Sequence, residues 1–190
     1  MEGSLPYNYL GVPMFWGKPR ATHFSKVLIQ VRKTLSSWKG KYLSMAGCVC
    51  LVKHVFISHI VYPFMVYIFS ASIIKALKSM MRNFFWSGNL MERKLITTKW
   101  SKCCMPTRQG GLGIKNLSCF NQELQAKFLW YLIHKKSSSL DFLRNRIISR
   151  LIAEKHGYLD SSICPGLHSV FQSIMRYSHW VVNLNSSLQF

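Results

Sequence analysis

Acidic residues are scarce in this sequence of 190 residues, which has six Asp and Glu against 25 Lys and Arg. None of the six lies between Glu2 and Glu92. Two-metal phosphoryl transfer needs carboxylates that converge on a pair of ions, so this half of the chain excludes such a site. The acidic residues from Glu92 onward form no D-D or D-x-D pair. We therefore predict no catalytic residue, metal ligand, cofactor or small-molecule substrate. A Cys–His or Ser–His dyad stays open, because its members need only meet in space.

A secretory leader with a basic start and an apolar core is also missing from the first residues. We therefore expect an intracellular protein, nuclear or cytoplasmic and not secreted, whose six cysteines are reduced. Zinc sites need two close ligand pairs a loop apart, and Cys48-x-Cys50 and Cys103-Cys104 lack properly spaced partners. His54 and His59 have a permissible spacing but no matching cysteine pair, so we interpret them as core or surface histidines.

Positive charge is what the sequence has in excess. The formal net charge is +19, while 49% of the residues are apolar and 14% are aromatic, which is too hydrophobic for a disordered tail. Ion pairs within the chain cannot balance such an excess, so we expect a polyanionic partner. A solvated basic face that keeps the protein soluble is the alternative.

Helical spacing dominates the chain, so we predict a mainly α fold. A helix capped by Thr22 has an apolar stripe at steps of four and three residues, formed by Phe24, Leu28, Val31, Leu35 and Trp38. Its opposite face has Lys26, Gln30, Lys33 and Ser37. The helix is therefore amphipathic, with a basic exposed face. We assign Trp38, Trp86 and Trp130 to the core rather than to base stacking.

Two further helices are predicted next. Ser44 caps an apolar helix that runs to Tyr62, where Pro63 kinks or ends it. Ser72 caps the following helix, and Gly88 ends it in a left-handed conformation. The buried side of that helix has Ile73, Ile74, Leu77, Met80, Met81, Phe84 and Phe85.

A membrane-spanning helix is an alternative for part of this region. Residues 55–74 contain no Lys, Arg, Asp or Glu, and their number is what a bilayer core requires. Pro63 and several serines interrupt the run, so we favour a buried helix, a bend and a new helix over membrane insertion.

The second half begins with a loop that has a short extended piece over Leu95 to Trp100. Its glycines at 110, 111 and 113 fit no phosphate-binding pattern, so we predict a tight turn. Ser118 then caps a helix whose stripe is Leu117, Phe120, Leu124, Phe128 and Tyr131. A shorter helix over 140–155 is stopped by Gly157.

Several phrases of the sequence together resemble one protein family. They are "YLGVPMFWGKP", "LSSWKGKYLSMAG", "LVKHVFISHIVYPF", "MRNFFWSG", "KWSKCCMPTRQGGLGIKNLSCFNQELQAKFLWYL" and "VFQSIMRYSHWVV". In that order and spacing they resemble the region after the catalytic palm in plant LINE-type (non-LTR) retrotransposon reverse transcriptases, from about Tyr9 to the C-terminus.

The resemblance implies a fragment of an RNA-directed DNA polymerase whose fingers and palm, with its "[FY]-x-D-D" carboxylates, lie elsewhere. It implies three segments: a palm strand remnant over 1–17, a basic thumb-like helical bundle over 18–100 and a helical connector over 101–190. Tyr9, Leu10 and Gly11 match the phrase near the primer end. We expect no polymerase activity from the chain alone, and a separately encoded palm is a second candidate partner.

The same resemblance implies backbone contacts to a template–primer duplex. A thumb neutralises phosphates without reading bases, and the candidates are Lys18, Arg20, Lys26, Lys33, Lys39 and Lys41. The family's closing "W-x-V-G-x-G" is altered, because Asn183 and Asn185 stand where the glycines belong. Asn tolerates a left-handed backbone, so the turn can survive. Decay of an untranslated, degenerate element explains the change equally well.

Overall fold

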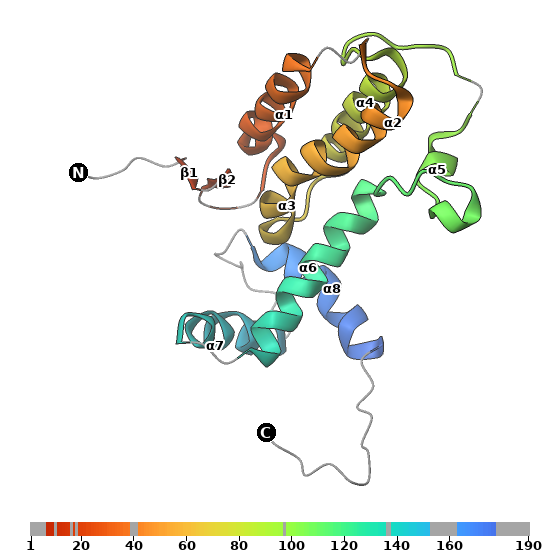
Figure 1. Cartoon of the computed structure of the whole chain (residues 1–190). Coiled ribbons are helices and arrows are strands. Elements are labelled where there is room, and N and C mark those ends of the chain that lie inside the picture. The colour runs from red at the N-terminus through yellow and green to blue at the C-terminus, as the bar shows by residue number, and fades with distance from the viewer. Residues whose placement is uncertain are drawn as a thin grey trace.

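The computed structural model describes residues 7–9, 11–15, 17, 19–38, 42–96, 98–135, 138–152 and 163–177. The fold is mainly α, as predicted (Figure 1). Its elements are β1 (Tyr7–Tyr9), β2 (Val12–Met14), a 3-10 turn η1 (Ala21–Phe24), α1 (Ser25–Ser37), α2 (Met45–Cys50), a π-helical segment η3 (Leu51–Phe56), α3 (Ile57–Val66), α4 (Ala71–Ser87), α5 (Trp100–Cys103), a 3-10 turn η4 (Thr107–Gln109), α6 (Leu117–His134), α7 (Ser138–Ile152) and α8 (Cys164–Tyr177).

The N-terminal strand is part of a hairpin. β1 and β2 pair antiparallel, with Tyr7 opposite Met14 and Tyr9 opposite Val12. Gly11 lies in the turn at φ 79°, in the left-handed region that glycine occupies without strain. The resemblance implied the remnant of one palm strand over 1–17. The structure corrects this, because the strand pairs with the residues that directly follow it.

Helix α1 has one buried face, as its apolar spacing predicts. Phe24, Val31 and Leu35 are buried, and Val27 joins them. Trp38 was wrongly assigned to this stripe, since 45% of its surface is exposed. The helix ends at Ser37, and the backbone of Trp38 is extended with ψ 121°, so its side chain leaves the helical face.

A single helical run follows from Met45 to Val66, made of α2, η3 and α3. It begins as predicted, because the Ser44 hydroxyl accepts a hydrogen bond from the Gly47 N–H at 3.2 Å. The helix does not end at Pro63, since α3 continues to Val66, and a kink at this residue stays a prediction. A proline removes only one helical donor, and the Pro63 carbonyl still accepts from the Tyr67 N–H at 2.9 Å.

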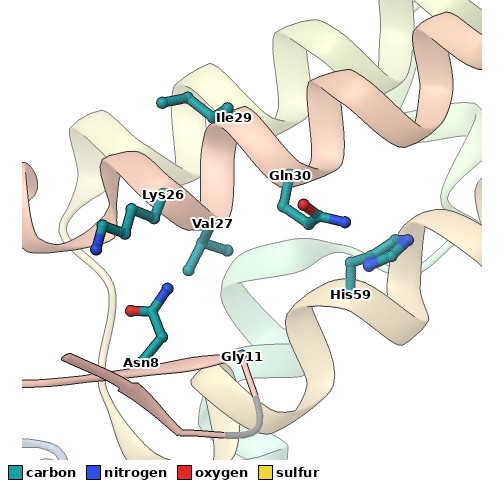
Figure 2. Close-up of a pocket in the computed structure, with 7 residues that line it drawn as sticks. All are labelled: Asn8, Gly11, Lys26, Val27, Ile29, Gln30 and His59. Carbon is teal, nitrogen blue, oxygen red and sulfur yellow. The ribbon is translucent and has the colours of Figure 1, made fainter.

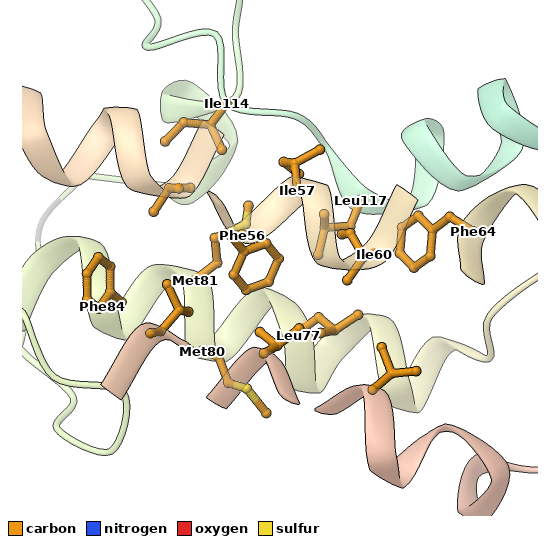
Figure 3. Packing of buried hydrophobic residues seen from close by; sticks show 14 of the residues in the cluster. Phe56, Ile57, Ile60, Phe64, Leu77, Met80, Met81, Phe84, Ile114 and Leu117 are labelled. Atoms are coloured by element: carbon orange, nitrogen blue, oxygen red, sulfur yellow. The ribbon is translucent and has the colours of Figure 1, made fainter. Parts of the chain in front are cut away.

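Helix α4 confirms the predicted apolar side, on which Leu77, Met81 and Phe84 are fully buried. Its N-cap is Ser70 rather than Ser72, and Gly88 ends it with the expected left-handed φ of 69°. Figure 3 shows side chains of η3 and α3 pointing toward those of α4, with Ile114 and Leu117 alongside. These helices therefore share one hydrophobic core.

The membrane alternative over 55–74 is not one helix, because α3 ends at Val66 and α4 begins at Ala71. Among the described residues, one helix is long and apolar enough to cross a membrane by length and composition, the run Met45–Val66 with mean hydropathy 1.7. Core helices pass the same test, and Val52, Phe56 and Ile60 of this run are fully buried in the protein.

The C-terminal helices enclose a second cluster. Figure 1 shows α6 running from the α1–α4 group to α7 and α8. Buried side chains from these three helices form the cluster: Leu129, Leu132, Ile147, Cys164, Leu167 and Val170. Helix α8 was not predicted individually, although Pro165 near its start is typical of a first helical turn. The predicted boundaries at residues 17 and 100 stay a prediction.

Helix α6 is rotated relative to its predicted face. Asn121 and Gln125 are buried, whereas Tyr131 is 43% exposed and Trp130, assigned to the core, is 47% exposed. The N-cap is Asn116, whose side chain accepts from the Ser118 N–H at 3.1 Å, so the predicted cap Ser118 is wrong. The predicted face was wrong because it was based on apolar residues alone, whereas the helix also buries two amide side chains that bond to the end of α3.

Two smaller predictions also differ from the structure. The predicted extended piece over Leu95 to Trp100 is wrong at its end: the backbone of Lys99 is extended, but Trp100 begins α5, and its side chain is buried against Phe85. The predicted helix 140–155 corresponds to α7, which spans Ser138–Ile152. Residues 153–157, including its predicted stop at Gly157, lie outside the described residues.

None of the six cysteines, all of which are described, is in a disulfide, and they differ in exposure. Cys50 and Cys119 are exposed, while Cys48, Cys103 and Cys164 are buried. Burial raises the pKa of the Cys48 and Cys103 thiols above the ordinary value of 9.0. Buried thiols with a raised pKa hold less thiolate and react slowly.

We expect two fast thiols, Cys50 and Cys119, and a slower remainder when the native protein reacts with a disulfide reagent at neutral pH. Urea should equalise the rates. The raised pKa values also determine how stability depends on pH. Above about pH 9 the unfolded chain loses these thiol protons while the folded chain keeps them. The free energy of unfolding should therefore fall as pH rises. If all six thiols of the native protein reacted equally fast, the burial of Cys48, Cys103 and Cys164 would be contradicted.

Candidate nucleic-acid interface

The outer face of α1 is cationic. Lys26, Gln30 and Lys33 are exposed on it, and Arg32 lies beside them. The helix buries Val31 against α3 and α4, so the period of 3.6 residues places these polar side chains in solvent. Among the described residues, the salt bridge found joins Asp141 and Arg144 in α7. The cations of α1 therefore have no close carboxylate in this part of the chain.

A groove lies between this helix and the hairpin. It has a volume of about 550 Å³ and is lined by Asn8, Gly11, Lys26, Val27, Ile29, Gln30 and His59. Figure 2 shows Lys26 and Val27 of α1 across from Asn8 of the hairpin, with His59 of α3 on the side of Gln30. The groove therefore combines a cation, two amides and an imidazole with the apolar side chains of Val27 and Ile29.

The hairpin wall of the groove is fixed by Tyr67, the residue that follows α3. Its buried hydroxyl donates to the carbonyl of Pro13 in β2 at 3.0 Å. Phe15 then stacks between Tyr67, with ring centroids 5.0 Å apart, and His23, at 4.0 Å. The groove is thus built from three segments that are held together by aromatic contacts and a buried hydrogen bond.

Two buried amides of α6 hold the end of α3 from the opposite side. The Asn121 side chain donates to the carbonyls of Phe64 and Tyr67 at 2.8 and 2.9 Å, and accepts from the Phe69 N–H at 2.8 Å. Gln125 donates to the carbonyls of Phe64 and Met65, both at 2.8 Å. These bonds satisfy backbone groups that the helix end leaves open.

The structure brings together some of the predicted site residues. Lys26 and Gly11 line the same groove, while Tyr9 is 63% exposed on β1. Lys33 is exposed on α1 outside the groove lining, and Arg20 lines a separate cavity of about 380 Å³ near Phe69. The remaining predicted residues lie outside the described residues: Leu10, Lys18, Lys39 and Lys41.

Two lining residues, Asn8 and His59, were not predicted. No local pattern identifies them, because the tertiary contact of β1 and α3 with α1 makes them neighbours. Neither is within helical spacing of Lys26, so only the folded chain shows the relation.

The glycines after η4 form a tight turn, as predicted. Their N–H groups are already bonded within the loop: Gly110 to the Thr107 carbonyl, Gly111 to that of Pro106 and Gly113 to that of Met105. A phosphate-binding loop needs free N–H groups that point at the anion. This turn therefore has a structural role.

A metal centre is not assembled in the part of the chain that the structure describes. Its His, Cys, Asp and Glu side chains form no group of three or more that could hold a metal ion. Hydrolysis by two metal ions needs such a group of carboxylates.

Comparison with known proteins gives two plant relatives. The chain is 34% identical over 115 residues to an Arabidopsis thaliana protein named as a ribonuclease H protein; the match covers 60% of this chain and 18% of that protein. It is 36% identical over 88 residues to an uncharacterized mitochondrial protein of the same plant, covering 45% of this chain and 57% of that protein. No family model and no solved structure matches.

These names overturn one prediction. The chain was identified by resemblance with the post-palm region of a retrotransposon reverse transcriptase, whereas its relatives are named as a ribonuclease H protein and an uncharacterized mitochondrial protein. The assignment of the chain to a reverse transcriptase is therefore wrong. The role near a primer end given to Tyr9, Leu10 and Gly11 came from that resemblance alone. The chain spans about a fifth of one relative and somewhat over half of the other.

Proposed function

We propose that this chain binds the phosphate backbone of duplex nucleic acid, as a helical binding segment that works beside catalytic carboxylates located elsewhere in a polypeptide or in a partner. The observation that carries the proposal is the α1 face beside the groove, where Lys26 and Lys33 are exposed and no described carboxylate lies within salt-bridge distance of them. The net charge of +19 supports it. Similarity to a protein named for ribonuclease H supports nucleic acid as the polyanion.

The contacts should be independent of base sequence. Lysines present point charges on flexible stems, which neutralise phosphates and read no base pattern. If roughly four phosphates are contacted, the slope of log K against log salt is about −3 to −4. The same relation gives about an eightfold loss of affinity for each contact removed at 0.1 M salt.

The test is a double variant, Lys26→Gln with Lys33→Gln, titrated against a labelled DNA duplex and an RNA–DNA hybrid. We expect the salt slope to fall in magnitude by about 1.8 and the affinity at 0.1 M salt to fall by about 60-fold. Fluorescence anisotropy over a range of salt concentrations measures both quantities.

The matched control is Lys127→Gln with Lys135→Gln. Both lysines are exposed on or just after α6, away from the groove, and the control removes the same two charges. It should leave most of the affinity and slope unchanged. Equal losses in both double variants would mean that net charge alone governs binding, which would contradict a site on α1.

A further inference from the structure

A second cationic pocket lies where α4 ends and α5 begins, and it shares no lining residue with the groove. Its volume is about 360 Å³. Four cationic side chains and two indoles line it: Arg82, Trp86, Arg93, Lys94, Lys99 and Trp100. Figure 1 shows the segment between α4 and α5 leaving the end of α4 and returning to the fold at α5.

The near wall of the pocket is the last part of α4. Arg82 and Trp86 are four residues apart, so they lie on one face of the helix. Trp86 is partly buried against the core through its edge-to-face contact with Phe85, at 4.6 Å between ring centroids. The remainder of its ring system lines the pocket.

The far wall is held at its start by a hydrogen-bonded turn. The Ser87 hydroxyl lies 2.8 Å from the Asn89 carbonyl and 2.9 Å from that of Glu92. The Asn83 side chain donates to the Leu90 carbonyl at 2.9 Å. These bonds fix the beginning of the segment against the end of α4, immediately before Arg93.

The far wall is also held at its end, because Trp100 is only 8% exposed and packs edge-to-face with Phe85 at 5.9 Å. Both walls are therefore tied to the core, and the four cations belong to these walls: Arg82 to α4, and Arg93, Lys94 and Lys99 to the connecting segment. In the described residues none of the four cations has a carboxylate at salt-bridge distance. Glu92 precedes Arg93 but is exposed and does not line the pocket.

We infer that this pocket binds one nucleotide of a single-stranded nucleic acid. Its phosphate lies among Arg93, Lys94 and Lys99, and its base stacks on Trp86. Aromatic rings together with cations form the usual platform for unpaired bases, and the volume is within the range of small-molecule sites. A base pair inside a duplex cannot offer its face to an indole, so the occupant is single-stranded. The inference rests on the proposed function only in that the chain binds nucleic acid.

The test compares three variants against a labelled oligothymidylate of about ten nucleotides, a length within the span of single-strand sites. Lys94→Gln with Lys99→Gln should weaken binding about 25-fold at 0.1 M salt and lower the salt slope by about 1.4, because each single-strand contact contributes about 0.7. Trp86→Leu should weaken binding about fivefold or more with an unchanged salt slope, since stacking is uncharged. Trp86→Phe keeps a ring and should retain most of the affinity.

Controls separate this pocket from the α1 groove and from misfolding. The duplex affinity of Trp86→Leu and of the Lys94/Lys99 variant should stay within about twofold of the parent, while the Lys26/Lys33 variant should lose duplex binding and retain the oligothymidylate. Circular dichroism and thermal melting check that each variant is folded. If the groove fails its own test and the pocket variants still lose the oligothymidylate, the pocket stands alone.

Two outcomes would overturn the inference. One is a Lys94/Lys99 variant that loses no more oligothymidylate affinity than the Lys127/Lys135 control. The other is polyglutamate competing for the labelled strand as well as unlabelled oligothymidylate of equal charge, which would mean that the pocket accepts any polyanion and that stacking plays no part.

Discussion

Replacing Asn121 with Ala is expected to lower the free energy of unfolding by about 3 kcal/mol or more. Asn121 is 2% exposed and makes three hydrogen bonds to backbone groups at the end of α3. Truncation removes the acceptor of the Phe69 N–H and the donor to the Tyr67 carbonyl. Each buried polar group that loses its partner costs about 1–3 kcal/mol, a large fraction of the stability of an ordinary domain.

The measurement is urea denaturation followed by circular dichroism. Gln122→Ala is the matched control, because Gln122 is the next residue of α6 and is exposed, so its change should stay within about 0.5 kcal/mol. Asn121→Asp keeps the shape and the acceptor but loses both donors and buries a charge, so at neutral pH it should cost at least as much as Ala. Equal stability of Asn121→Ala and Gln122→Ala would refute the structural role.

The same residue bears on the candidate interface. Asn121 holds the carbonyl of Tyr67, and the Tyr67 hydroxyl holds Pro13 in the hairpin wall of the groove. A chain of contacts therefore runs from α6 through the end of α3 to the surface beside Lys26. The groove depends on tertiary contacts made by three separate segments. Loss of the Asn121 contact is therefore expected to loosen the hairpin more than it alters α1.

Periodicity predicted those elements that bury one apolar face. In α1 and α4 the buried residues follow the apolar spacing, so the exposed positions of Lys26 and Lys33 were predictable from the sequence. In α6 the same method gave a rotated face. Asn121 and Gln125 fill buried positions there and bond to carbonyls 54 to 61 residues earlier in the chain. No local pattern contains that information, because these two amides are buried where their NH2 groups reach backbone carbonyls that are distant in the sequence.

The candidate interface could likewise be predicted from the sequence only in part. The cationic character of the α1 face is a property of one helix, whereas its pairing with Asn8 and His59 is a property of the fold. The pocket beside Trp86 had no sequence signal as a site, since Arg82 belongs to α4 and the other cations to a connection predicted as a loop. Aromatic and cationic residues on neighbouring segments become a site only when both segments are fixed, here by Ser87 and Trp100.

Gly111 carries the second large expected effect. A Cβ at this position would lie 2.5 Å from the carbonyl carbon of Met105 and closer still to its oxygen. These are backbone atoms, and the Met105 carbonyl is held by the Gly113 N–H at 2.8 Å. The clash therefore cannot be relieved by rotating a side chain, and relief by moving the backbone breaks a hydrogen bond. We expect Gly111→Ala to cost about 3 kcal/mol, the upper end of typical overpacking.

Gly110→Ala in the same turn separates steric overlap from backbone strain. Gly110 has φ 77° and no atom within 4 Å of the added Cβ, so its substitution meets only the left-handed penalty of about 1 kcal/mol. Urea denaturation should therefore give a clearly lower free energy of unfolding for Gly111→Ala than for Gly110→Ala. Equal costs would mean that the turn adjusts freely, and the close approach to Met105 would then not determine its shape. A lower stability of Gly111→Ala alone would show that glycine is required there for space, at a position where the loop leads into the buried Ile114 and the start of α6.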